Sequence, residues 1–387
     1  MVNYVFLSVY FYSVPNLRFN NDPYKKYNLY EFATRVTRKN KDNVSNLPLT
    51  ISAQYGLVDQ VSFFNKTVAS KDMSGYYLLK NGEFAYNKSY SNDYPWGAIK
   101  RLDLYDMGCL STLYICFKTN DNIVNSNYLV HYFESSKWHK QVADIAGEGA
   151  RNHGLLNIGV NDFFNTKHAV PTIENQIKIA GFLDLIEKRI QTQIKIINDY
   201  KILKNHIIKS FIKQNGTSYL LSEIAELGRG RVINSAEISK QKNPIYPVYS
   251  SQTSNNGIMG YLDNYDYEGE YITWTTDGAN AGTVYYRNGK FNCTNVCGIL
   301  KIKNGYDAYY ISNILNCYTK KYVSTNLANP KLMNNVMANI KINLPSIEQQ
   351  KHSSKILQSI EYRVEIEEDI KLNLVKQKAF LLKNMFI

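Results

Sequence analysis

The chain has 387 residues, enough for two or more domains with separate cores, and 44% of them are hydrophobic. Its net charge of +12 and its 32 tyrosines favour a polyanionic partner and aromatic-rich surfaces. The five cysteines are scattered and form no pair of CxxC motifs, which argues against a disulfide framework and a structural zinc site. Many lysine-rich proteins are simply basic, so charge alone does not identify the partner.

The first 14 residues are apolar but lack the basic start and the cleavage site of a signal peptide. They are also too short to span a bilayer. We interpret residues 1–14 as an N-terminal extension or a first strand, and we expect a cytoplasmic protein without membrane association.

A short segment, Leu29 to Val36, then carries apolar residues at helical spacing. A matching segment opens the second half of the chain, where Glu223–Ala225 corresponds to Glu31–Ala33. The two halves therefore begin alike.

From Leu47 to Phe117 the pattern changes to short alternating runs broken by Gly, Asn, Asp and Pro, which predicts a β-rich globule. Within it, a GE-aromatic strand at Gly82 is followed by a polar loop and by the apolar run CLSTLYICFK, expected to be one buried strand. The second half repeats this order from Gly269, with a different loop length. The sequence predicts two globules with exchangeable loops.

The longest repeat runs from Val170 to Lys213 and returns without a gap 174 positions later, from Leu344 to Ile387. About a quarter of the aligned pairs are identical. Each copy starts with a proline, a capping Thr or Ser, and a glutamate in the first turn, as helices often do. Each predicted helix of about 40 residues has a length of roughly 60 Å.

Apolar residues recur in these two segments at steps of three and four, which is typical of a coiled-coil seam. The expected seam residues are Leu183, Ile186, Ile190, Ile197, Leu357, Ile360, Val364 and Leu374. Polar residues interrupt the seam at Gln193 and Lys204 and at their equivalents, Glu367 and Lys378. Polar seam positions cost stability and fix the register of the two helices, as expected of a scaffold. The alternative is that both segments are ordinary surface helices.

Nothing in the sequence indicates catalysis. The NDPY stretch at Asn21 to Tyr24 lacks the glycine-rich turn of a methyl-donor site and is interpreted as a turn. The chain has no phosphate-binding GxxxxGK[ST] loop, and its histidines and acidic residues show no metal-ligand spacing. We therefore predict no catalytic residue, no metal site and no cofactor bound by this chain.

The polar loops of the two globules combine amides, cations and aromatic rings, the side chains that proteins use to contact DNA bases and phosphates. The candidate DNA-binding residues are Lys88, Tyr90, Asn92, Tyr94, Trp96, Lys100, Arg101, Arg151, Asn152, His153, Arg229, Arg231, Ser250, Ser251, Gln252, Asn255, Asn256, Thr275, Thr276, Asn280, Arg287, Asn326, Asn329 and Lys331. Polar loops also occur on the surface of any β domain, so the clusters carry more weight than any single residue.

The chain resembles the specificity subunits of type I restriction-modification enzymes. The resemblance rests on NLRF near the start, on NKSYSNDYPWGAIKRL followed by LSTLYICFK, and on the motifs VPTIENQ and LPSIEQQ that open the long segments. It covers nearly the whole chain and implies an α+β fold, with two β-rich target recognition domains, each followed by a conserved helix. The two helices would pack as an antiparallel coiled coil with pseudo-two-fold symmetry.

On this basis we divide the chain into an extension (1–14), a first target recognition domain (15–169), a first spacer helix (170–216), a second recognition domain (217–343) and a second spacer helix (344–387).

The resemblance further implies a DNA-binding, non-catalytic subunit in a bacterial cytoplasm that reads a bipartite target and sets its spacer length. The expected partners are double-stranded DNA, two modification (methyltransferase) subunits and restriction (translocase and nuclease) subunits. S-adenosylmethionine, ATP and Mg are expected on those partners. Two other classes remain open: a coiled-coil scaffold whose β domains bind other proteins, and an enzyme with an unrecognised site.

Overall fold

The computed structural model describes residues 24–386, apart from residues 67, 92–93, 147–153, 214 and 325–328. The chain divides into two compact units: unit 1 comprises residues 1–192 and 370–387, and unit 2 comprises residues 193–369. The proposed extension 1–14 and the NLRF motif lie outside the described residues. Both units combine sheets with helices, and each contains half of each long helix, which confirms the predicted α+β class.

Unit 1 is built from short antiparallel strands. Its main sheet has the order β2-β9-β6-β7, formed by Ala33–Arg35, Ile115–Thr119, Phe84–Asn87 and Ala98–Arg101. Three further strand pairs are β1-β10 (Lys25–Asn28 with Lys167–Val170), β3-β4 (Leu49–Ser52 with Gly56–Asp59) and β5-β8 (Tyr77–Lys80 with Met107–Leu110). The short helices are α1 (Leu29–Phe32), α2 (Gln60–Phe64), α3 (Ser126–Glu134), α4 (His139–Ile145) and α5 (Val160–Phe164), with a 3-10 turn at Lys41–Asn43. We call this part of unit 1, without the long helices, the first globule.

Unit 2 contains one six-stranded sheet of order β12-β17-β15-β16-β13-β14. These strands are Ala225–Arg229, Cys297–Ile302, Tyr267–Thr275, Val284–Cys293, Tyr246–Tyr249 and Ile258–Leu262. The pairing of β13 with β16 is parallel, and the others are antiparallel. A separate strand pair joins β11 (Thr217–Leu220) to β18 (Lys341–Leu344). The short helices are α7 (Leu221–Ile224), α8 (Ser235–Ser239), α9 (Ala308–Tyr318) and α10 (Asn334–Ala338). Two 3-10 turns lie at Ser254–Gly257 and Thr319–Tyr322. This part of unit 2, without the long helices, is the second globule.

The two globules begin with the same local structure. In each, a short strand pairs with the strand just before a long helix: β1 with β10, and β11 with β18. A one-turn helix follows, and its glutamate accepts a hydrogen bond from the backbone N–H at the helix start, Glu31 from Asn28 (2.6 Å) and Glu223 from Leu220 (2.7 Å). The expectation that the repeat extends beyond the long helices is confirmed.

The opening helix is shorter than its spacing predicts. It ends at Phe32, and Ala33–Arg35 instead form β2, paired with residues 117–119 of β9. The prediction of one strand across CLSTLYICFK is also wrong, because β8 ends at Leu110 and β9 begins at Ile115. In both cases strand pairing with distant residues decides the backbone, which local spacing does not reveal.

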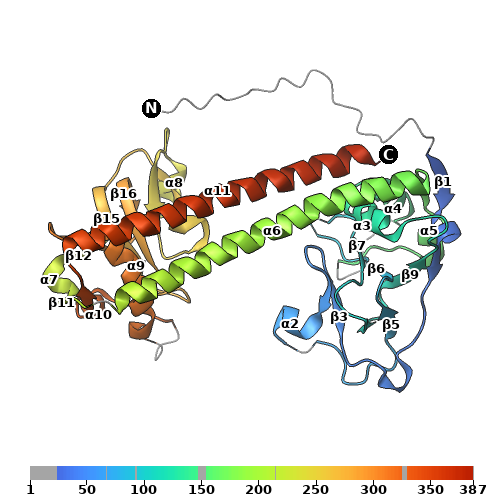
Figure 1. The fold of residues 1–387 in the computed structure, drawn as a ribbon, viewed down its shortest axis with the longest axis horizontal. Helices are drawn as coiled ribbons and strands as arrows, with labels where there is room; N and C mark the ends of the chain where they lie inside the picture. Colours follow the sequence, from blue (N-terminus) through green and yellow to red (C-terminus); the bar gives the residue numbers. More distant parts are fainter. Residues whose placement is uncertain are drawn as a thin grey trace. The chain divides into compact units, whose positions relative to one another are not determined.

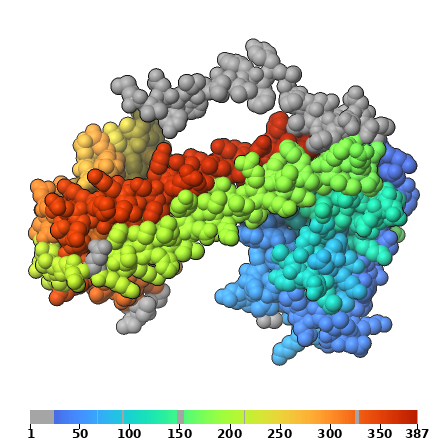
Figure 2. Space-filling view, viewed as in Figure 1, coloured from blue at the N-terminus to red at the C-terminus, as the bar shows by residue number. Residues whose placement is uncertain are grey.

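The long helices are α6 (Ile173–Ile212) and α11 (Ile347–Met385), 40 and 39 residues long. The first half of α6 lies beside the second half of α11 in unit 1, and the remaining halves lie beside each other in unit 2, so the helices are antiparallel (Figure 1). Their side chains are in contact in the space-filling view (Figure 2). This confirms the predicted packing of two long helices.

Each unit has its own main core, to which the long helices contribute. In unit 1, buried residues of the first globule, such as Phe117 and Tyr132, join Leu183 of α6 and Leu381 of α11. In unit 2, Trp274 and Leu300 belong to a cluster that includes Ile208 of α6 and Leu357 of α11. Within the described ranges, no helix is long and apolar enough to cross a bilayer.

Candidate nucleic-acid interface

Four of the candidate residues of the first globule, Asn92 and residues 151–153, lie outside the described residues. Tyr90 and Tyr94 are 45% and 38% exposed. Trp96 is half-buried against the core, and its carbonyl accepts a hydrogen bond from the Tyr86 hydroxyl (2.8 Å). The exposed rings stay candidates for contact with a ligand, whereas Trp96 anchors the loop that carries them.

Three candidate cations of this globule are held by the chain itself. Lys88 Nζ lies 3.4 Å from the carbonyl of Ile158. Arg101 donates to Asp103 (2.6 Å) and to the side chains of Ser126 and Asn127 (2.8 Å each). Arg101 therefore joins β7 to the start of α3, and any contact with a phosphate would compete with these bonds.

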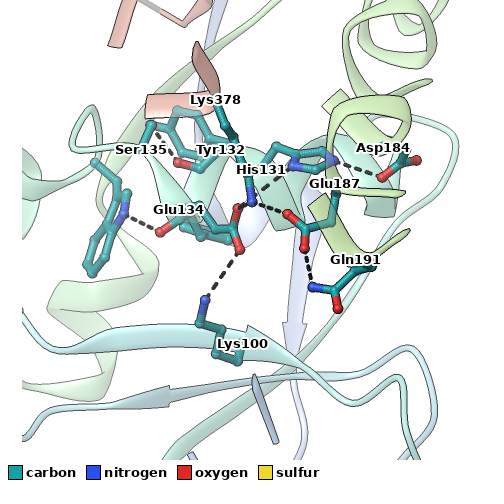
Figure 3. A network of polar contacts seen from close by, with 11 residues as sticks. Lys100, His131, Tyr132, Glu134, Ser135, Asp184, Glu187, Gln191 and Lys378 are labelled. Atoms are coloured by element: carbon teal, nitrogen blue, oxygen red, sulfur yellow. Dashed lines mark hydrogen bonds and ion pairs between the residues drawn. The ribbon is translucent and has the colours of Figure 1, made fainter. Parts of the chain in front are cut away.

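The third cation, Lys100, belongs to a polar network between the first globule and the long helices (Figure 3). Lys100 Nζ lies 3.5 Å from the carboxylate of Glu134, at the end of α3. Glu134 also pairs with Lys378 of α11 (2.8 Å), and Lys378 pairs with Glu187 of α6 (2.7 Å). His131 of α3 contacts Asp184 of α6 at 2.8 Å.

The charged groups of this network shift one another's pKa values. Burial acts to raise the pKa of Glu134, but the neighbouring His131 ring, 3.9 Å away, and the charges of Lys378 and Lys100 outweigh it and hold the pKa well below 4.5. Burial acts to lower the pKa of Lys378, yet Glu134 and Glu187 raise it above 10.5. Glu134 and Lys378 are therefore both charged at neutral pH.

Sequence reasoning missed Glu134, His131 and Asp184. The repeat marks only the two helix residues of the bridge, because Glu187 and Lys378 have equivalents at Glu361 and Lys204. In unit 2 those equivalents also form an ion pair, in which the lysine lies on α6 and the glutamate on α11.

In the second globule, Arg231 is committed to two carboxylates, Glu237 (2.7 Å) and Asp266 (3.0 Å). The guanidinium of Arg229 lies near the Met333 sulfur (3.4 Å). Lys331 pairs with Asp277 at 3.5 Å. Asn329 is exposed, and Asn326 lies outside the described residues.

The loop from Ser250 to Gly257 contains a left-handed turn. Asn255 and Asn256 have φ values of 48° and 52°, and Gly257 follows at 81°. Non-glycine residues adopt this conformation at an energetic cost, so surrounding contacts have to hold it. The loop is closed by the Ser250 N–H, which donates to the Gly257 carbonyl (3.0 Å), and by the Gln252 side chain, which donates to the Ile258 carbonyl.

Arg287 lies beneath this loop and is 4% exposed. Its guanidinium lies between the rings of Tyr249 (3.6 Å) and Tyr285 (4.4 Å) and donates to the Asn256 carbonyl (2.9 Å). A Cβ atom at Gly257 would lie 3.1 Å from its Nη2 atom. Arg287 thus supports the loop, while the side chains of Asn255 and Asn256 are exposed.

Two other candidates of this globule, Thr275 and Thr276, are also buried. Their hydroxyls donate to the Asn280 carbonyl and to Asp277, respectively. Asn280 in turn donates to the Thr253 hydroxyl (3.0 Å), which links the two neighbouring loops. Of the candidates in these loops, Ser251 and Gln252 are half-buried, and the amides of residues 255 and 256 face solvent.

Seven of the eight expected seam residues are buried. Leu183, Ile186, Ile190 and Leu374 are buried in unit 1, Ile197, Leu357 and Ile360 are buried in unit 2, and Val364 is half-buried.

Residues 215–377 match the family model described as the type I restriction modification DNA specificity domain. A Mycoplasma pneumoniae protein named as a candidate type I specificity subunit is 37% identical over 196 residues, which cover 49% of this chain and 81% of that protein. A second such protein from the same organism, named as an N-terminal part, is 43% identical over 142 residues, or 36% of this chain and 75% of its own length.

The specificity subunit of the type I restriction enzyme MpnII, also from M. pneumoniae, is 42% identical over 146 residues, which cover 37% of this chain and 43% of that protein. Among solved structures, the S subunit of a type I restriction-modification system from M. genitalium superposes with a TM-score of 0.58 at 15% identity, covering 97% of this chain and 99% of that chain. A structure from a study of complex assembly in the type I system gives the same TM-score and identity over 93% of this chain and 96% of the other. Both superpositions agree in the fold.

Proposed function

The chain belongs to the family of type I restriction-modification specificity subunits, and from this premise we propose that it reads a split DNA target, with one half-site contacted by each globule. The observation that carries the proposal is the repeated build of the chain. Two globules with the same opening structure are each attached to an equivalent pair of half-helices, while their loops differ. A repeated frame with two different polar loop sets suits two half-sites of different sequence.

We assign the exposed polar loops to base contacts. In the second globule these are the amides at residues 255 and 256, and in the first they are the loop residues around Tyr90 and Tyr94. Side-chain amides pair with adenine in the major groove, and lysines and arginines pair with guanine or with phosphates. The net charge of +12 would support binding to the phosphate backbone.

The long helices would set the spacer between the half-sites. A helix of 40 residues has a length of about 60 Å, on the order of two turns of B-DNA. Inserting one heptad between Glu187 and Lys209 is therefore expected to change the accepted spacer or to abolish assembly.

We further propose that the chain is not itself catalytic and that it docks two modification subunits and the restriction subunits. These partners would supply methyl transfer to adenine, with base flipping, and DNA translocation and cleavage. S-adenosylmethionine, ATP and Mg would then be bound by the partners. Methyl transfer or cleavage by the purified chain alone would contradict this assignment.

The competing function is a scaffold whose globules bind other proteins. The two functions differ in their response to salt, because affinity for DNA falls linearly with salt concentration on a log-log scale as phosphate contacts release counterions. We expect the complex with the modification subunits to bind duplex DNA with such a slope. A flat response, or no binding to any duplex, would favour the scaffold.

Domain exchange tests the modular part of the proposal. Replacing residues 47–165 by those of a relative is expected to change one half of the recognised sequence and to leave the other half intact. A change in both halves would contradict the assignment of one half-site to each globule.

A further inference from the structure

One contact between globule and helix is the same in both units. Near the start of α6, the buried Gln176 side chain accepts a hydrogen bond from the Asn125 backbone N–H (2.7 Å), at the N-terminal cap of α3. Near the start of α11, the buried Gln350 side chain accepts from the Asp307 N–H (3.1 Å), at the cap of α9. In each copy the glutamine amide also donates to the carbonyl of the proline two residues before its helix (2.8 Å). This contact fixes where the helix of each globule begins against a long helix.

A second contact involves an ion pair between the long helices. In unit 1, Lys378 of α11 pairs with Glu187 of α6, and the first globule adds Glu134 to the lysine side of this bridge (Figure 3). The side chains of Lys378 and Glu134 are 17% and 25% exposed, so water screens the contact only in part.

In unit 2, the equivalent bridge joins Lys204 of α6 to Glu361 of α11. Here the second globule adds a group to the glutamate side, because the Tyr309 hydroxyl of α9 donates to the Glu361 carboxylate. The bridge is thus common to both units, whereas the side chain that the globule supplies differs in chemistry.

The interface beside each bridge is hollow. A cavity of about 450 Å³ lies next to Glu187 and Lys378 in unit 1, and one of about 470 Å³ lies next to Lys204 and Glu361 in unit 2. Close packing between the globule and the long helices is therefore interrupted beside each bridge. The polar contacts contribute more to holding the globule here than they would in a densely packed interface.

We propose that the repeated lysine–glutamate bridge and the glutamine near each helix start form a socket for a globule, with Glu134 and Tyr309 as positioning residues that set how each globule is held. This inference rests on the proposed reading of a split site, because the orientation of the globules would then determine which spacer length is accepted. The same pair of long helices would then hold any globule that offers a hydrogen-bond acceptor to the bridge lysine or a hydrogen-bond donor to the bridge glutamate.

The test uses the full chain with its modification subunits and measures methylation of duplexes that carry the recognised motif. The duplexes have the native spacer, or a spacer one base pair shorter or longer. Tyr309→Phe removes the hydroxyl but keeps the ring, which packs edge-on against Tyr286 (centroids 5.2 Å apart). Glu134→Gln removes the charge at similar size. The control is Glu174→Gln, which breaks an exposed ion pair with Lys178 within α6.

A double exchange separates helix pairing from docking of the globule. Glu187→Lys combined with Lys378→Glu keeps a bridge between α6 and α11 but places a carboxylate against Glu134. We expect this pair of substitutions to weaken spacer discrimination as Glu134→Gln does, although the helices remain bridged.

The readout is the ratio of rates on native and altered spacers, which is independent of the fraction of folded protein. We expect this ratio to fall by about threefold or more in Tyr309→Phe and Glu134→Gln, with the same bases recognised and with the control unchanged. Wild-type ratios in both variants would overturn the socket while leaving the proposed function intact. Absence of any split motif for the wild-type complex would instead overturn the proposed function, and the socket with it.

Discussion

The Gln193 amide of α6 donates a hydrogen bond to the Glu367 carboxylate of α11, its own equivalent 174 positions later. It also lies 3.3 Å from the Glu367 carbonyl, and both side chains are buried, at 8% and 3% exposure. Glu367 further pairs with Arg363 at 2.6 Å. In two antiparallel helices that repeat one another, a residue contacts its own repeat equivalent only at the midpoint of their pairing. This pair therefore marks the register of α6 against α11.

We predict that Glu367→Leu lowers the free energy of unfolding by roughly 1–3 kcal/mol, because the buried Gln193 amide loses its carboxylate acceptor and keeps only the residue-367 carbonyl. Adding Gln193→Leu is expected to recover much of the loss, since two apolar residues can replace a buried polar pair. Urea unfolding of the three proteins measures this. If Glu367→Leu alone were as stable as the wild type, the hydrogen bond between Gln193 and Glu367 would not contribute to stability.

The Glu134 network predicts a loss of stability in acid. The pKa of Glu134 in the folded chain lies below the ordinary value of 4.5, so its stabilising effect is complete above pH 4.5 and is lost as the pH falls further. Glu134→Gln is expected to be less stable than the wild type at pH 7 and to have a shallower decline below pH 4.5. Thermal unfolding between pH 7 and 3 tests this, and parallel curves for the two proteins would contradict it.

His168 predicts a further loss of stability in acid, which begins at a higher pH than the loss caused by Glu134. Burial lowers its pKa to about 4, from 6.5, and its ring nitrogens contact Tyr132 (2.9 Å) and Thr166 (2.8 Å). The unfolded chain takes up the proton first, so stability falls from pH 6.5 to about 4 by at most about 1.4 kcal/mol per pH unit. His168→Gln should flatten this part of the curve. An unchanged slope above pH 4.5 would assign the decline to other groups.

Arg287 is predicted to act on the second half-site through the loop at residues 250–257. Arg287→Met removes its hydrogen bond to the Asn256 carbonyl and its charge between the two tyrosine rings. We expect faster backbone hydrogen exchange in this loop and weaker binding of the second half-site, by about tenfold, with the first half-site unaffected. Asn255→Asp keeps both the buried support and a side chain that tolerates the left-handed turn, so it should weaken binding without faster exchange in the rest of the loop. Equal exchange in Arg287→Met and wild type would show that other contacts hold the turn.

The long helices were predictable because their pattern is local and occurs twice. Steps of three and four residues and the repeated proline, cap and glutamate are visible in the sequence, and the structure places α6 and α11 where the repeat lies. The end of α1 at Phe32 was not predictable, because β2 forms through pairing with β9, more than eighty residues away in the chain.

The candidate interface was harder to predict for a related reason. Composition selects Lys100, Arg101 and Arg287 as DNA contacts, but it does not reveal the intrachain partners that hold them. Glu134 was missed because only the folded chain brings the end of α3 to the bridge between α6 and α11. Side chains that look available in a sequence can be committed to neighbours that lie far away along the chain.

The proposed function is tested most directly by sequencing the methylated bases in the genome of a host that carries this chain together with its modification subunits. We predict methylated adenines in a split motif, with two specific halves separated by a spacer of fixed length. Deletion of this chain alone should abolish that methylation. A continuous motif, or the same methylation without the chain, would contradict the proposal that its two globules read the two halves.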